Sequence, residues 1–164
     1  MTQQEMTERE VALKTVAGFF AYGFGSGLAP FAPGTFGTLA AMPFAFALKL
    51  LSIPLQLTII AVAFFVGIYL CEVTGSRVGR KDPGGIVWDE MVAYWLTVVF
   101  LPYHWAWLVA AFIVFRVFDI FKPWPIPLVE RRYRGGFGVM FDDIIAAVYA
   151  MLVLHGAAWL LAQI

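Results

Sequence analysis

The amino-acid sequence predicts an all-α integral membrane protein, a small bundle of about four to five membrane segments with a polar site at the cytoplasmic face. Hydrophobic residues make up 62% of the 164 residues and charged residues only 13%, whereas soluble domains contain about 45–50% and about 25%. The charged residues also leave four long stretches empty, at 15–48, 50–71, 91–115 and 144–164. A membrane-spanning helix needs about 20 apolar residues, so these stretches predict one membrane-embedded domain over residues 1–164.

The second and fourth charge-free stretches each have the length of one spanning helix. The first contains too many helix breakers for a single helix, because residues 18–34 include seven glycines and prolines. We therefore expect its span to run from Thr35 to Leu51. An interfacial helix within residues 1–20 is expected before it, since the apolar residues there lie partly on one side of a helical wheel.

The third charge-free stretch, residues 91–115, could form one long span or a hairpin of two short, re-entrant segments about residues 101–104, where a proline interrupts the apolar pattern. One span would place the loops 72–90 and 119–143, with three and four basic residues, on opposite sides of the membrane. A hairpin places both loops on the cytoplasmic side, as the positive-inside rule favours. We therefore predict five membrane segments, with the N-terminus inside and the C-terminus outside.

Composition also excludes several classes of function. Lys plus Arg and Asp plus Glu both number 11, so the chain has no overall positive charge that would attract nucleic acid. Cys71 is the only cysteine, which excludes an intramolecular disulfide and a zinc site built from several thiolates. We expect neither a nucleic-acid partner nor an obligatory protein partner.

A glycine and proline loop, residues 23–35, leads into the first expected span. Glycines allow backbone N–H groups to approach an anion, and a helix N-terminus adds partial positive charge. The end of this loop, at Gly34 and Thr35, could therefore bind a phosphate. The alternative is a flexible loop in which Thr35 only caps the helix.

Two acidic pairs stand at the start of apolar segments. Asp89 and Glu90 follow an apolar triplet, and Asp142 and Asp143 follow a second glycine loop that includes Gly136. Acidic residues stabilise a helix N-terminus by about 0.3–1 kcal/mol, so a solvated helix start, with Asp142 as its cap, is the alternative interpretation. The apolar triplet before Asp89 and Glu90 instead favours a position of this pair at or below the membrane interface.

A basic and acidic motif follows the third charge-free stretch. Arg116 and Asp119 are three residues apart and could share one face of a helix, while Lys122 precedes alternating prolines. These prolines predict an extended chain after Lys122. A structural ion pair at the helix end is the alternative.

The five acids together predict a metal site. Each acid drawn into a membrane costs about 2.5–3.5 kcal/mol, so such a group needs a compensating cation. Carboxylates without a cysteine or histidine pair favour Mg²⁺, and nearby cations, Arg116, Lys122 and Arg131, could bind phosphate. His104 and His155 lie in apolar segments and are expected on the far side. The parts are those of a phosphoryl-transfer site.

The four motifs resemble the phosphatidylglycerophosphatase A family. They occur in the order of that family, at residues 23–38, 86–90, 115–126 and 135–143, and together span nearly the whole chain. The resemblance implies a multi-pass enzyme of the bacterial inner membrane, with its active site facing the cytoplasm, that hydrolyses phosphatidylglycerophosphate to phosphatidylglycerol with Mg²⁺. The basic run at residues 131–134 is not part of the family signature.

On this basis each polar residue receives an expected role. Arg116 and Lys122 would neutralise charge on the phosphate, and Asp119 would bind metal or act as general base. The substrate would contact Gly34, Thr35, Lys122, Arg131 and Gly136, and Mg²⁺ would bind Asp89, Glu90, Asp142 and Asp143, of which Asp143 is also catalytic. The competing hypothesis is a small ion or metabolite carrier that uses the interfacial carboxylates, although a carrier would place them along a path through the bilayer.

Overall fold

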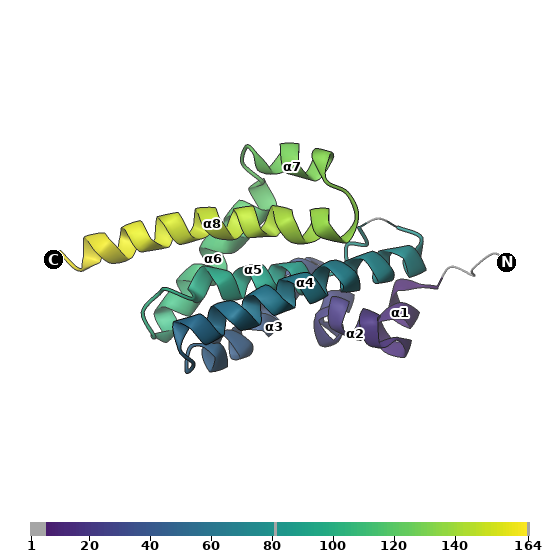
Figure 1. The fold of residues 1–164 in the computed structure, drawn as a ribbon, viewed down its shortest axis with the longest axis horizontal. Coiled ribbons are helices and arrows are strands. Elements are labelled where there is room, and N and C mark those ends of the chain that lie inside the picture. The colour runs from purple at the N-terminus through teal and green to yellow at the C-terminus, as the bar shows by residue number, and fades with distance from the viewer. Residues whose placement is uncertain (1–5, 81, 164) are drawn as a thin grey trace.

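A computed structural model describes residues 6–80 and 82–163 and shows only helices there, with no β-strand (Figure 1). Two short helices and a 3₁₀ segment come first, then long helices, with one more short helix before the last. In chain order they are α1 (Glu8–Lys14), α2 (Val16–Ala21), the 3₁₀ segment η1 (Gly23–Leu28), α3 (Pro33–Leu48), α4 (Ile53–Val78), α5 (Trp88–Val98), α6 (Trp105–Phe121), α7 (Ile126–Arg132) and α8 (Gly135–Leu161).

Helices α4 and α8 are long and apolar enough to cross a membrane, with 26 and 27 residues. At about 1.5 Å per residue each extends roughly 40 Å, more than the roughly 30 Å of a bilayer core. Large apolar side chains on them point outward, for example Phe65 at 69% and Leu152 at 66% exposure. Such surfaces suit a hydrocarbon solvent and are consistent with a helical membrane protein.

Helix α5 forms the centre of the bundle and packs against α3, α4, α6 and α8. All of its residues except Glu90 and Leu96 are buried. Three aromatic side chains tie it to its neighbours by hydrogen bonds to backbone carbonyls: Trp88 to Ala63 of α4, Trp95 to Ala41 of α3, and Tyr94 to Leu108 of α6. Its first turn is therefore held in a fixed place among the other helices.

The stretch 91–115 is a helical hairpin, because α5 ends at Val98 and α6 begins at Trp105. Lys49, at the end of α3, donates hydrogen bonds to the carbonyl oxygens of Val99 and Leu101, at 2.9 and 2.6 Å. A cation at the end of α5 satisfies carbonyls that have no partner within that helix. The hairpin turn thus lies at the opposite end of the bundle from the start of α5.

Three local predictions need correction. The first long helix begins at Pro33 and ends at Leu48, since proline suits the first turn of a helix. The chain does not stay extended after the prolines, because α7 begins at Ile126 and has Pro127 in its first turn. The second glycine run is helical, because α8 already begins at Gly135 and has Arg134 as its cap.

The glycines at the start of α8 serve helix packing. A Cβ atom on Gly136 would lie 2.0 Å from the carbonyl oxygen of Ile68 in α4, so only glycine permits this close approach. As a result Asp142 and Asp143 lie about two turns inside α8. They are held on a rigid helix between α5 and α7.

The expected interfacial helix is divided in two, and residues 1–5 lie outside the described residues. Thr15 ends α1 and caps α2, since its side chain accepts a hydrogen bond from the Gly18 N–H at 3.0 Å. Both helices pack against α4 near its C-terminal end. Val16 and Phe19 of α2 are 78% and 42% exposed, as expected for a helix on a membrane surface.

Candidate active site

Three carboxylates from two helices converge at one end of the bundle. Asp89 and Glu90 occupy the first turn of α5 and Asp143 lies on α8, and one oxygen atom of each lies within 4.8 Å of the others. Asp89 Oδ1, Glu90 Oε2 and Asp143 Oδ2 are buried without a hydrogen-bond partner in the described part of the chain. Unpaired buried carboxylates are costly unless a cation compensates them. These hard oxygen ligands fit a divalent ion such as Mg²⁺.

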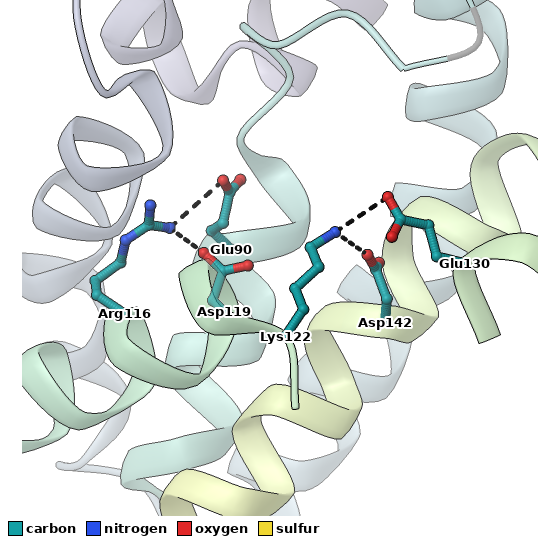
Figure 2. A network of polar contacts seen from close by, with 6 residues as sticks. All are labelled: Glu90, Arg116, Asp119, Lys122, Glu130 and Asp142. Carbon is teal, nitrogen blue, oxygen red and sulfur yellow. Dashed lines mark hydrogen bonds and ion pairs between the residues drawn. The ribbon is translucent and has the colours of Figure 1, made fainter. Parts of the chain in front are cut away.

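Arg116 joins this acidic cluster from α6. Its guanidinium forms ion pairs with Glu90, at 3.6 Å, and with Asp119 one turn further along the same helix (Figure 2). Asp119 also neighbours Asp143. Arg116 and Asp119 thus form the ion pair that was the alternative interpretation of this motif. The pair is nevertheless part of the acidic cluster.

Gly34 brings the start of α3 against the same group. A Cβ atom on Gly34 would lie 2.1 Å from Glu90 Oε1 and 3.0 Å from Arg116 Nη1. Only glycine therefore allows the backbone to approach this ion pair. Thr35 follows in the first turn, but its N–H donates to the Ala32 carbonyl at 2.9 Å, and Ala32 rather than Thr35 is the cap of the helix.

Lys122 forms a second polar group beside the first. It lies just past the end of α6 in a left-handed conformation with φ of 42°. Its Nζ donates to Asp142 Oδ2 at 2.8 Å and lies 3.4 Å from Glu130 Oε1 (Figure 2). Burial lowers the pKa of Lys122, but the hydrogen bond to Asp142 and nearby acidic charges outweigh burial and raise the pKa, so the ammonium stays charged.

The two neighbouring aspartates of α8 therefore face different partners. Successive residues on an α-helix point about 100° apart. Asp143 consequently points towards α5, whereas Asp142 points towards Lys122. The structure brings Asp89, Glu90 and Asp143 together and leaves Asp142 outside that group.

Gly136 and Arg131 lie apart from the acidic group. The Gly136 N–H donates to Glu72 Oε2 of α4 at 2.7 Å, so this N–H already has a hydrogen-bond acceptor. Arg131 is exposed in the last turn of α7 and forms no ion pair within residues 6–80 and 82–163. The assignment of both residues to the substrate stays a prediction.

Two acids contact predicted site residues but were not themselves among the sequence candidates. Glu72 accepts a hydrogen bond from the Gly136 N–H at the start of α8, and Glu130 contacts Lys122. Glu72 directly follows a charge-free stretch, and Glu90 and Asp143 directly precede one, so all three stand at the boundary of an apolar segment. Glu130 lies beside a basic run and gives no such signal.

The chain is similar to known proteins over most of its length. A family model described as Phosphatidylglycerophosphatase A matches residues 19–158. A phosphatidylglycerophosphatase A of Escherichia coli (strain K12) is 43% identical over 136 residues, 82% of this chain and 79% of the relative. One of Haemophilus influenzae is 40% identical over 156 residues, 93% and 96% of the two chains. A candidate phosphatidylinositol-3-phosphatase of Bacteroides thetaiotaomicron is 39% identical over 147 residues, 85% and 91%. No solved structure matches the chain significantly.

Proposed function

The chain belongs to the phosphatidylglycerophosphatase A family, and from that premise we propose that it hydrolyses the terminal phosphate monoester of phosphatidylglycerophosphate. The products are phosphatidylglycerol, a membrane phospholipid, and inorganic phosphate. The observation that carries the proposal is the convergence of Asp89, Glu90 and Asp143 beside Arg116 and Lys122. The carrier hypothesis has no support, because the acids gather at one end of the bundle.

Asp89, Glu90 and Asp143 would hold Mg²⁺, since each has a buried oxygen without a partner among the described residues. When bound, the ion would neutralise charge on the phosphate oxygens and make water more acidic. Asp142 is assigned instead to Lys122, whose ammonium it holds at 2.8 Å. This assignment replaces the four-acid site expected from the sequence with three ligands and one positioning residue.

Arg116 and Lys122 would place positive charge on both sides of the phosphate. Charge that develops on the phosphoryl oxygens during transfer is stabilised by such fixed cations. Asp119 lies beside Arg116 and neighbours Asp143, where it could accept a proton from the attacking water. In the reaction a bond forms between the water oxygen and phosphorus, the bond to the head-group oxygen breaks, and that oxygen takes up a proton.

The site is assigned to the cytoplasmic side of a bacterial membrane, with several segments crossing or entering the bilayer. Two helices are long and apolar enough to span it. The loops beside the acidic cluster contain most of the Lys and Arg residues, and Lys49 lies at the other end. This distribution supports a cytoplasmic site by the positive-inside rule.

The test is phosphate release by the purified protein from phosphatidylglycerophosphate in detergent micelles. We expect turnover with Mg²⁺ and its loss on chelation. Phosphatidylinositol 3-phosphate serves as a comparison substrate, because one relative carries that name. No phosphate release from phosphatidylglycerophosphate under any divalent ion would contradict the proposed function.

A further inference from the structure

A cavity of about 340 Å³ lies beside the acidic cluster. It is open to the surface and is lined by the segment from the end of α7 to the start of α8 and by the loop after α4. Its polar lining consists of Asp82, Glu130, Tyr133, Arg134 and Asp142. We propose that this cavity binds the head group of the lipid substrate and that Arg134 contacts the phosphodiester linking head group to diacylglycerol. The inference rests on the proposed function and adds a binding site for the second phosphate of the substrate, the phosphodiester.

The cavity adjoins the place assigned to the terminal phosphate. Asp142 and Glu130 line it, and both contact Lys122 Nζ, at 2.8 and 3.4 Å. Figure 2 shows these two acids on the side of Lys122 that faces away from Arg116. With the terminal phosphate bound beside Lys122, the rest of the head group would therefore extend into this cavity.

The acids of the cavity suit a hydroxylated head group. Asp142 Oδ1 is buried and has no hydrogen-bond partner within the described residues. A carboxylate oxygen can only accept hydrogen bonds, so it needs a donor, and the glycerol hydroxyl of phosphatidylglycerophosphate is such a donor. Lys122 offsets part of the negative charge of Asp142 and Glu130, which limits their repulsion of the substrate.

Arg134 is the basic residue in the lining. It is exposed, forms no ion pair within the described residues, and makes no side-chain hydrogen bond as the cap of α8. A guanidinium can bind two phosphate oxygens at once. Arg131 and Arg132 belong to the same basic run but do not line the cavity.

An aromatic stripe leads from the cavity along α8. The rings of Tyr133 and Phe137 lie 5.4 Å apart, and those of Phe137 and Phe141 are stacked at 5.2 Å. Tyr133 is 43% and Phe137 38% exposed. Because α8 is a membrane helix, acyl chains can lie along this stripe while the phosphodiester stays at Arg134.

Arg134→Gln tests the proposal because it removes the positive charge. It removes no capping hydrogen bond, since the Arg134 side chain makes none to α8. We expect KM for phosphatidylglycerophosphate to rise about tenfold, as for loss of one charge-assisted hydrogen bond, while kcat changes little. Competitive inhibition by phosphatidylglycerol, which retains the phosphodiester, should weaken equally. Inhibition by inorganic phosphate, which lacks a head group, should stay unchanged. Arg134→Lys should recover part of the affinity.

Arg77→Gln is the matched control, because Arg77 is also an exposed arginine but lies on α4 outside this cavity. An unchanged KM in Arg134→Gln, or an equal rise in the Arg77 control, would overturn the inference. A rise in KM in Arg131→Gln but not in Arg134→Gln would also overturn it. Turnover by the unaltered protein is measured first, so a failure of the proposed function is seen separately.

Discussion

Gly34 and Glu90, from α3 and α5, touch so closely that a Cβ atom on Gly34 would lie 2.1 Å from Glu90 Oε1. Gly34→Ala should therefore displace Glu90 and Arg116 and lower kcat by about 100-fold, because small misplacements of catalytic groups have effects of that size. Phosphate release and the yield of folded protein are measured together. Gly84→Ala is the control, since nothing lies within 4 Å of a Cβ atom there. Full activity of Gly34→Ala would show that the contact is not needed.

Asp143 and Asp142 should differ in their effect on the metal. Asp143→Asn removes one proposed ligand, so the Mg²⁺ concentration for half-maximal activity should rise strongly. Asp142→Asn should lower kcat by about tenfold to 100-fold, as for loss of a positioning partner, with little change in that concentration. Titration of activity with Mg²⁺ distinguishes the two variants.

Asp89→Asn should resemble Asp143→Asn, and the double variant should be little worse than either single variant, because residues that act as a unit are non-additive. If Asp142→Asn raises the Mg²⁺ requirement as much as Asp143→Asn, the four-acid site expected from the sequence is the better description. If both Asp89→Asn and Asp143→Asn keep the Mg²⁺ dependence of the wild-type protein, these acids are not metal ligands.

Lys122→Gln should reduce turnover by about 100-fold, as for loss of one fixed charge that stabilises the transition state. The backbone of Lys122 has φ of 42°, which is unfavourable for most residues, so the effect of charge must be separated from that of the backbone. Lys122→Arg keeps the charge and should retain more activity than Lys122→Gln at equal protein yield. Equal activities of the two variants would contradict a role for the charge.

Gly136→Ala should act on stability rather than on catalysis. Its Cβ atom would lie 2.0 Å from the Ile68 carbonyl, and overpacking of this kind costs about 1–3 kcal/mol. The apparent Tm in detergent should fall, while KM of the folded fraction stays the same. Gly156→Ala is the control on the same helix, because its surroundings are open. A raised KM with unchanged Tm would favour the substrate contact predicted from the sequence.

The orientation in the membrane can be tested with cysteine labels or tags in sealed cells. A tag between Arg131 and Gly135 should be labelled only after the cells are opened, because the basic loops are expected in the cytoplasm. A tag in the turn at Ser52, between α3 and α4, should be labelled from outside. Labelling of the first tag in intact cells would reverse the proposed topology.

Local patterns were sufficient for part of the fold. The break of residues 91–115 into α5 and α6 followed from a proline and from charge placement. The start of α8 at Gly135 did not, because a glycine run is usually a loop. It is helical here because α4 lies so close that only residues without a side chain fit, as at the contact of Gly136 with Ile68. The two residues of this contact are far apart in the sequence, so local patterns do not predict it.

The sequence by itself determined that the chain is helical, with two stretches long and apolar enough to span a bilayer and with acids at the boundaries of its apolar segments, because bilayers exclude charge from long helices. It also carried the motifs of the family. Only the tertiary structure decided how these acids are divided. Asp142 and Asp143 are equivalent in sequence, but neighbouring side chains on a helix diverge, so packing of α8 between α5 and Lys122 turns one towards the carboxylates and the other towards the ammonium.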